Sequence, residues 1–179
     1  ILYFVRLFAI EFIAIEEGDP LSPSSWRGIA KKSCLYKVLS SILARRLTTY
    51  LEARGVLPHE QRGFRRDRST MTACSELIAE IRYSLTQKKK PLYALFVDYK
   101  AAFDTAPRSI LIQKLANVGV GQRLLRLLAS ILKANPIVLE DGVCEHEPFL
   151  QTTGYAQGDN LSALFFTVLM NDLPSLLKD

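Results

Sequence analysis

The sequence predicts an α+β fold that is mostly helical with a small β-sheet, because helical and strand-like apolar segments follow one another in mixed order. Its 179 residues, 49% of them hydrophobic, suffice to bury a core, and this composition excludes disorder as the main state. The most apolar stretch, Ile1 to Ile15, is interrupted by Arg6 and Glu11. It therefore falls short of the roughly 18 uninterrupted apolar residues that a membrane-spanning helix needs.

The first residues indicate whether the chain begins with a signal peptide, and the cysteines indicate the redox state of its compartment. The apolar start has no initiator Met, no basic lead and no small-residue cleavage site, so we interpret it as interior sequence of a longer protein. Cys34, Cys74 and Cys144 lie far apart without metal-ligand spacing. They favour a reducing compartment and no zinc site.

Two amphipathic helices are predicted in the first half. Apolar residues recur at helical spacing from Ser33 to Tyr50, and Gly55 follows the end of this pattern. A second helix begins near Thr70 and ends before the break at Lys88-Lys89-Lys90-Pro91. The apolar stripe of the first helix consists of Leu35, Val38, Leu39, Ile42, Leu43, Leu47 and Tyr50.

A short strand and two more helices are predicted next. Leu92 to Val97 is apolar, rich in aromatic and branched residues, and ends at Asp98, which predicts a buried strand with a carboxylate at its end. One helix is opened by Pro107 and closed by Gly119. The other spans about Gln122 to Lys133.

The last elements are a hairpin and a buried helix. Asp141-Gly142, flanked by Ile137 to Glu140 and by Val143 onward, predicts a two-residue hairpin turn. The segment from about Leu161 to Leu173 is apolar on almost every side, as in a helix buried in a core, and Pro174 is expected to end it.

The net charge of +5 conceals a strong asymmetry along the chain. Arg27 to Lys90 has a balance of +10, with 15 Lys and Arg against 5 Asp and Glu, whereas the remainder has a balance of −5. A basic half is typical of a protein whose partner carries phosphates, and an acidic remainder offers carboxylates that can hold metal ions. The alternative is that the basic helices are merely solvated faces.

Two constellations carry candidate chemistry. A carboxylate at the end of a buried strand needs a partner, so Asp98 suits a hard cation such as Mg²⁺. The alternatives are a helix N-cap or a salt bridge to Lys100 or Arg108. The loop Gly154 to Ser162 leads into the buried helix, and its glycines allow close approach of a nucleotide base or phosphate. Its alternative is an ordinary loop with a capping Asp or Asn.

The order of these motifs resembles that of a known enzyme family. The block Leu95 to Asp104, followed by Gln157 to Phe165, resembles the first palm motif and the Gln-Gly motif of reverse transcriptases from non-LTR retrotransposons. Upstream segments resemble the fingers of the same family in the same order: Trp26 to Ala30, Tyr36 to Val38, Leu43 to Leu47, Gln61 to Arg66 and Arg68 to Thr70. The ordered matches span Gly18 to Leu173.

The resemblance implies a right-hand polymerase, with fingers in residues 1–90 and the front of the palm in residues 91–179. Asp98 matches the first catalytic aspartate, which in the family helps to hold two Mg²⁺ or Mn²⁺ ions. The backbone carbonyl of Val97 or Tyr99 is expected to assist. The resemblance also implies an intracellular protein, nuclear or cytoplasmic, with no membrane partner.

The resemblance further implies where substrates bind. Phe103 matches the aromatic sugar gate that excludes a 2′-hydroxyl. Gln157 and Gly158 match the loop under the incoming nucleotide and template, and Arg27 matches an arginine near the triphosphate. The expected partners are an RNA template, a DNA primer and deoxynucleoside triphosphates. The residues expected to bind nucleic acid are Arg62, Arg65, Arg66 and Arg68.

This sequence departs from the family pattern in three places. Glu16 stands where the family usually has a phosphate-binding lysine. Asn160 and Ala163 stand where prolines are common, which alters rigidity more than chemistry. The chain ends at Asp179, before any aromatic-x-Asp-Asp motif, so the second catalytic carboxylate, the rest of the palm and the thumb are not in it. We therefore expect this chain alone to be inactive.

Two functions from different classes follow. The first is a piece of an RNA-directed DNA polymerase that copies retrotransposon RNA into DNA by two-metal nucleotidyl transfer. The second is a non-catalytic, polymerase-derived nucleic-acid-binding protein. A reading frame that continues into an aromatic-x-Asp-Asp motif supports the first function.

Overall fold

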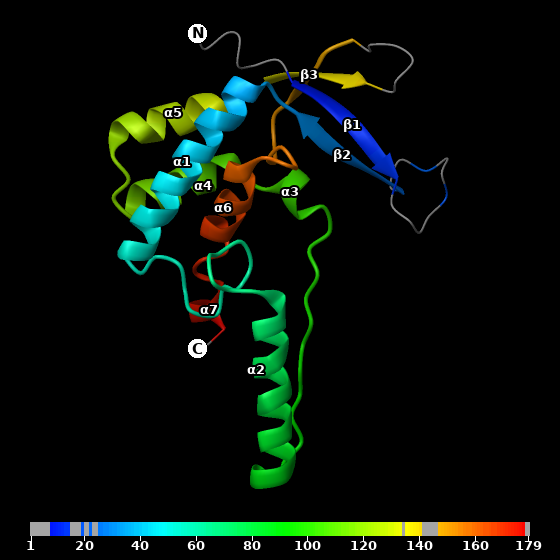
Figure 1. Cartoon of the computed structure of the whole chain (residues 1–179), viewed down its shortest axis with the longest axis vertical. Coiled ribbons are helices and arrows are strands. Elements are labelled where there is room, and N and C mark those ends of the chain that lie inside the picture. The colour runs from blue at the N-terminus through cyan, green and yellow to red at the C-terminus, as the bar shows by residue number, and fades with distance from the viewer. Residues whose placement is uncertain are drawn as a thin grey trace.

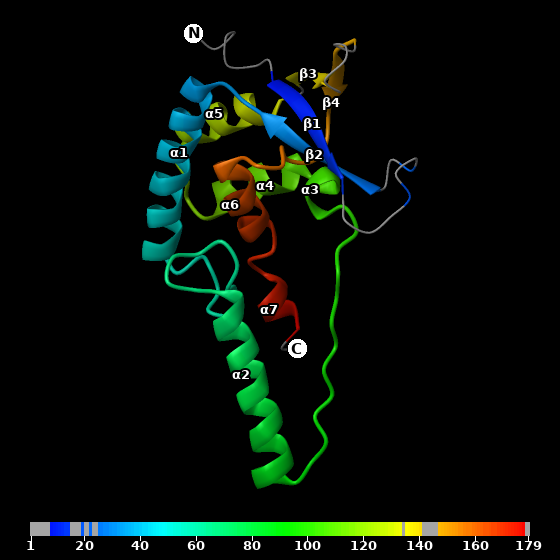
Figure 2. The same ribbon diagram turned by 45° about the vertical axis from the view of Figure 1, so that its right-hand side comes forward.

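A computed structural model describes residues 8–14, 19, 22, 25–133, 135–140 and 147–177. The described chain forms a body of helices with a small sheet at one side, and an arm extends from this body (Figure 1). A view turned by 45° shows the same division (Figure 2). None of the helices in the described ranges is long and apolar enough to span a bilayer.

The sheet has four strands in the order β2-β1-β3-β4. They are β1 (Phe8–Ala14), β2 (Trp26–Lys31), β3 (Asn135–Glu140) and β4 (Phe149–Gln151). β1 pairs antiparallel with β2 and parallel with β3, and β3 pairs antiparallel with β4. Sequence analysis did not anticipate β1 and β2. Nevertheless, the predicted combination of many helices with a small sheet is confirmed.

Four helices build the core of the body: α1 (Cys34–Ala53), α4 (Arg108–Asn117), α5 (Gln122–Leu132) and α6 (Asn160–Leu169). Their leucines interdigitate in one cluster with Tyr155 and Phe165, so apolar burial holds these helices together. The expected burial of the last long helix is confirmed, since six of the ten residues of α6 are buried. It ends at Leu169, however, and Pro174 lies inside a separate short helix, α7 (Leu173–Leu176).

α1 follows the predicted pattern closely, but only part of its apolar stripe is buried. Ser33 caps the helix by accepting a hydrogen bond from the amide of Tyr36, and Gly55 has a φ of 63° just beyond the end. Leu43 and Leu47 of the predicted stripe are buried, whereas Leu35 is 78% exposed. Periodicity identified the helix, but it did not establish which half of a wide apolar stripe meets the core.

The arm consists of α2 (Thr70–Tyr83), a π-helical turn η3 (Ser84–Lys88) and the segment 91–99 that runs back along them (Figures 1 and 2). Ser69 caps α2 in a capping box with Thr72, as expected for a helix that begins near Thr70. Helical turns continue to Lys88, slightly beyond the predicted end. No residue of α2 is buried.

The predicted buried strand Leu92 to Val97 is wrong for this structure. The segment has no strand pairing, and its side chains are exposed, with Tyr93 at 90% and Leu95 at 89%. A strand requires a neighbour to which its backbone groups can bond, and the described part of the chain places none beside this segment. The apolar composition of the segment led to a prediction of burial, but burial depends on which other segments pack against it.

The hairpin near Asp141-Gly142 is confirmed only as a pair of strands. β3 and β4 are antiparallel, as expected, and the turn itself lies outside the described residues. The register pairs Ile137 with Phe149.

Candidate functional site

Three segments that are distant in sequence meet at one place on the body. They are the end of β2, the turn around the short helix α3 (Ala102–Thr105), and the loop of residues 152–159 between β4 and α6. The amide of Ala30 donates to the carbonyl of Gln157 at 3.0 Å. The amide of Tyr155 donates to the carbonyl of Phe103 at 2.7 Å. The structure thus brings the Gln-Gly loop into backbone contact with both other segments.

Gly154 allows this close approach. Its φ is 73°, and its amide donates to the carbonyl of Ala106 at 3.0 Å. A Cβ at this position would overlap the carbonyl oxygen of Asp104 and lie 2.5 Å from that of Phe103. Only glycine fits both the backbone conformation and the space. Gly158, the glycine of the Gln-Gly pair, also has a positive φ, of 93°, and it is exposed.

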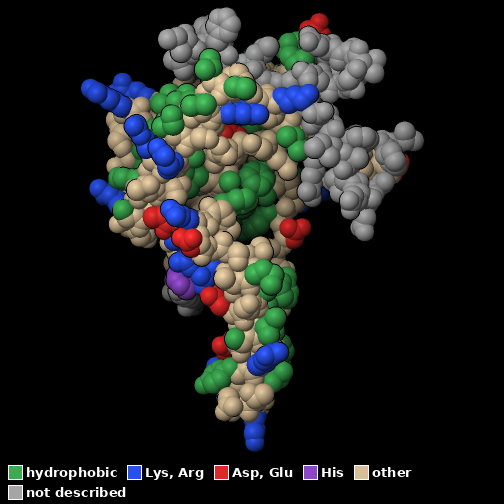
Figure 3. Space-filling view, viewed as in Figure 1, with side chains coloured by type: hydrophobic (Ala, Val, Ile, Leu, Met, Phe, Trp, Pro, Cys, Tyr) green, Lys and Arg blue, Asp and Glu red, His purple; other side chains and the backbone are tan. Residues whose placement is uncertain are grey.

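Aromatic rings gather beside this meeting point. The ring of Phe103 lies against that of Phe166 of α6, with centroids 5.4 Å apart, and Tyr99 meets the same ring edge-on at 6.3 Å. Figure 3 shows a hollow in this face of the molecule, floored by hydrophobic side chains over α3 and α6. Phe103 is half-buried, so its ring is held in place and still partly accessible.

Asp98, with its neighbours Val97 and Tyr99, lies on the exposed end of the segment 91–99. No ion pair joins Asp98 to Lys100 or Arg108 among the described residues. Its carboxylate has the oxygen chemistry that Mg²⁺ prefers. However, in the ranges that the structure describes, no three His, Cys, Asp or Glu side chains converge to hold a metal ion. The metal role of Asp98 therefore stays a prediction.

Two further residues singled out in the sequence are Arg27 and Glu16. Arg27 is in β2, where it pairs with Ile13 of β1, three residues before the amide that bonds to the Gln-Gly loop. Its strand therefore leads directly to the meeting point. Glu16 lies outside the described residues.

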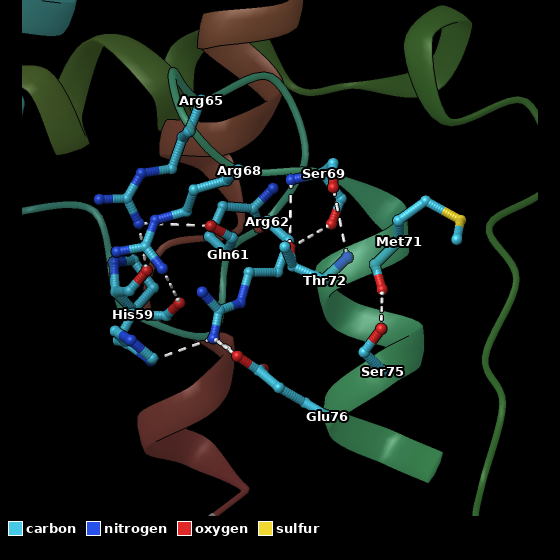
Figure 4. A network of polar contacts seen from close by, with 11 residues as sticks. His59, Gln61, Arg62, Arg65, Arg68, Ser69, Met71, Thr72, Ser75 and Glu76 are labelled. Atoms are coloured by element: carbon cyan, nitrogen blue, oxygen red, sulfur yellow. Dashed lines mark hydrogen bonds and ion pairs between the residues drawn. The ribbon is translucent and has the colours of Figure 1, made fainter. Parts of the chain in front are cut away.

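The arginine loop, residues 58–68, is held mainly by its own arginines (Figure 4). Arg62 donates to both carboxylate oxygens of Glu76 on α2, at 2.5 and 2.7 Å. Arg65 donates to both carboxylate oxygens of Glu52 on α1, at 2.8 and 2.6 Å, and to the carbonyl of Pro58 at 2.6 Å. Its side chain is only 7% exposed. These two arginines join the loop to two helices, a structural role that sequence analysis did not foresee.

Of the other two arginines of the set, Arg66 is exposed and Arg68 is partly buried. Arg66 is 94% exposed, and it forms an ion pair with its neighbour Asp67 at 3.6 Å. Arg68 donates to the carbonyl of His59 at 3.3 Å. Both arginines line a pocket with Arg65 and with Thr48 of α1. The four arginines were predicted together because they lie in one basic loop. In the structure they differ in how far each guanidinium is exposed to a phosphate.

Arg108 holds the entry to the Gln-Gly loop. Its guanidinium donates to the carbonyls of Gly154 at 2.6 Å, Gln151 at 2.9 Å, Thr153 at 2.9 Å and Leu132 at 2.7 Å. Burial lowers the pKa of Arg108, but an arginine stays charged. Sequence analysis considered Arg108 only as a partner for Asp98, and no local signal pointed to these carbonyls.

Asp159, Lys32 and Tyr36 hold the exit of the loop. Asp159 caps α6 by accepting from the amide of Leu161 at 3.3 Å, which confirms the capping role considered for it. Its other carboxylate oxygen accepts from Lys32 and from the hydroxyl of Tyr36, both at 2.6 Å. Burial lowers the pKa of Lys32, opposed by Asp159, and burial together with the carboxylate raises the pKa of Tyr36. Sequence analysis missed both partners, which lie more than 120 residues from Asp159.

Comparisons with known proteins bear on what this arrangement does. Residues 15–179 match the family model described as "Reverse transcriptase (RNA-dependent DNA polymerase)". The chain is 28% identical over 164 residues to "Retrovirus-related Pol polyprotein from type-1 retrotransposable element R2" of Popillia japonica, covering 88% of this chain and 22% of that protein.

Two proteins of Drosophila melanogaster show similar likeness. "Probable RNA-directed DNA polymerase from transposon BS" is 29% identical over 153 residues, covering 86% of this chain and 17% of that protein. "Probable RNA-directed DNA polymerase from transposon X-element" is 25% identical over 152 residues, covering 85% and 16%. The chain thus spans about a fifth of the length of these relatives. With the family model matching nearly all of it, the chain belongs to the reverse transcriptase family and is related to the enzymes of non-LTR retrotransposons.

Proposed function

We propose that this chain is the fingers and the front of the palm of an RNA-directed DNA polymerase that copies retrotransposon RNA into DNA. The observation that supports this most is the convergence of β2, the Phe103 turn and the Gln157–Gly158 loop. Each of these segments carries a residue that the family resemblance assigns to the incoming nucleotide. A nucleotide-binding site requires that such residues lie close together, and the backbone contacts between the three segments support this arrangement.

The roles proposed for the individual residues follow from their chemistry. Arg27 binds the triphosphate, the ring of Phe103 meets the sugar, and Gln157 with Gly158 supports the base and template. Asp98, assisted by a carbonyl of Val97 or Tyr99, would hold Mg²⁺ or Mn²⁺ with a carboxylate from elsewhere in the protein, and the bound ions would supply Lewis-acid chemistry for nucleotidyl transfer.

The template and primer belong to the basic fingers in this proposal. Arg66 is the exposed member of the predicted set and meets phosphates, with the partly buried Arg68 beside it, whereas Arg62 and Arg65 shape the loop that presents them. Because its proposed template is retrotransposon RNA, we expect the protein to act inside the cell, in the nucleus or the cytoplasm.

The test uses a protein that joins this chain to an aromatic-x-Asp-Asp segment of the family. Asp98→Asn should abolish primer extension and leave primer–template binding nearly unchanged, because it removes a metal ligand and not the basic surface. Asp172→Asn is the matched control. The Asp172 carboxylate pairs with Lys114, so this variant should retain primer extension. Full extension by Asp98→Asn would refute the proposed role.

The second candidate function is a polymerase-derived protein that binds nucleic acid without catalysis. The basic balance of Arg27 to Lys90 favours it, because binding to a phosphate backbone needs positive charge and no metal site. The same experiment separates the two functions. Salt-sensitive binding of primer–template by the parent protein without any extension would support the second candidate.

A further inference from the structure

The Gln-Gly loop depends on other parts of the chain for its position. Residues 152–159 form neither helix nor strand, so no regular hydrogen-bond ladder holds them. The entry of the loop is tethered by Arg108, from the same half of the chain. Its exit is tethered across the site, to Lys32 in the connection between β2 and α1 and to Tyr36 in the first turn of α1.

This exit tether, Lys32–Tyr36–Asp159, is a compact buried cluster. One carboxylate oxygen of Asp159 accepts from both the ammonium of Lys32 and the hydroxyl of Tyr36. The ammonium also lies 4.1 Å from the centroid of the Tyr36 ring. The side chains of Lys32 and Asp159 are 9% and 5% exposed. Because the charges are shielded from water, losing one partner would leave the other poorly solvated, so the cluster holds one geometry strongly.

The cluster lies where it can set the width of the site. Lys32 directly follows β2, and Asp159 directly follows Gly158. The hydrogen bond from Ala30 to Gln157 lies on the same side, between the same two segments. Any displacement of Asp159 from Lys32 and Tyr36 would therefore move the Gln-Gly loop away from the strand that carries Arg27.

We propose that Lys32 and Tyr36 are positioning residues that act through Asp159 to hold the Gln157–Gly158 loop at a set distance from β2. The inference rests on the proposed function, since the loop is taken to support the incoming nucleotide. Lys32 and Tyr36 do not touch the nucleotide in this account. They determine how well the loop is aligned before the nucleotide binds.

Tyr36→Phe tests this in a protein that joins the chain to the second carboxylate motif. It keeps the buried ring and removes one hydrogen bond to a charged group. The KM for the deoxynucleotide should rise about fivefold while the KM for primer–template stays unchanged. Asp159→Asn, which retains a good capping residue for α6, should raise the same KM at least as much. A merely structural role would lower the amount of active protein and leave the nucleotide KM unchanged.

Tyr50→Phe is the matched control. Tyr50 is on the same helix as Tyr36, and its hydroxyl donates to the carbonyls of Val118 and Gly119, at 3.1 and 2.8 Å. Neither acceptor belongs to the Gln-Gly loop. It should leave the nucleotide KM as in the parent protein. An equal rise in Tyr36→Phe and Tyr50→Phe would overturn the proposal.

Amide hydrogen exchange of the 179-residue chain gives a readout that needs no activity. Tyr36→Phe and Asp159→Asn should accelerate exchange of the Ala30 amide, whose acceptor is Gln157, and Tyr50→Phe should not. Parent protein that extends no primer would count against the proposed function. Extension with an unchanged nucleotide KM and unchanged exchange in both cluster variants would refute the positioning role alone.

Discussion

Gly154→Ala should be unusually damaging for so small a change. An alanine at a φ of 73° costs about 1 kcal/mol in the left-handed region. Its Cβ would also overlap the carbonyl of Asp104, so loop and turn must separate. Separation breaks the hydrogen bonds from Gly154 to Ala106 and from Tyr155 to Phe103, each worth about 1 kcal/mol. The expected loss of unfolding free energy is therefore about 3 kcal/mol.

Gly55→Ala separates the strain from the overlap. Gly55 has a similar φ of 63°, but a Cβ added there would meet nothing within 4 Å, so its substitution should cost only the conformational strain of about 1 kcal/mol. Urea unfolding of the isolated chain measures both losses. With a slope of about 2 kcal/mol per molar, the midpoints should fall by about 1.5 M and about 0.5 M. Equal shifts in the two variants would refute the argument that Gly154 is required by close packing of the loop against the Phe103 turn.

Three further predictions concern the sugar gate, the basic loop and acid stability. In a protein that includes the second carboxylate motif, Phe103→Val should raise ribonucleotide incorporation relative to deoxynucleotide incorporation, and unchanged discrimination would exclude the gate. Neutralising Arg66 and Arg68 together should reduce the slope of log affinity against log salt by about one unit per lost phosphate contact, whereas Arg65→Gln should lower stability and leave the slope intact. The Arg65 hydrogen bond holds the pKa of Glu52 below its ordinary value of 4.5, so its stabilisation is present above that pH and is lost as pH falls through the lowered pKa. On acidification, the unfolding free energy of Glu52→Gln should therefore fall less than that of the parent. The difference should be at most about 1 kcal/mol, because the carboxylate side chain is 38% exposed. Identical dependence of the unfolding free energy on pH in both proteins would contradict this prediction.

The helices of the body were largely predictable because their signals are local. Ser33 and Gly55 mark the ends of α1, and the all-apolar stretch of α6 indicated a buried helix. The family was predictable for a similar reason, since its motifs are short segments in a fixed order. By contrast, β1 and β2 were missed, because a strand is stabilised by a neighbour that the local sequence does not identify.

The candidate site shows the same division. The sequence alone identified Asp98, Phe103 and the Gln157–Gly158 pair by motif, and it located most of the basic charge in residues 27–90. Only the tertiary structure showed that Arg62 and Arg65 are occupied by carboxylates while Arg66 is exposed. Charge can be counted along a chain, but the availability of a charge depends on which side chains fold against it.

The tethers of the Gln-Gly loop were decided by the tertiary structure alone. The contacts of Arg108 are with backbone carbonyls, which every residue possesses and which leave no mark in the sequence. The contact of Lys32 and Tyr36 with Asp159 joins residues more than 120 positions apart. Amino-acid types and spacing thus determined which helices form and which family the chain belongs to. The meeting of β2, the Phe103 turn and the loop required the folded chain, because burial and hydrogen bonding between distant segments exist only once those segments are packed together.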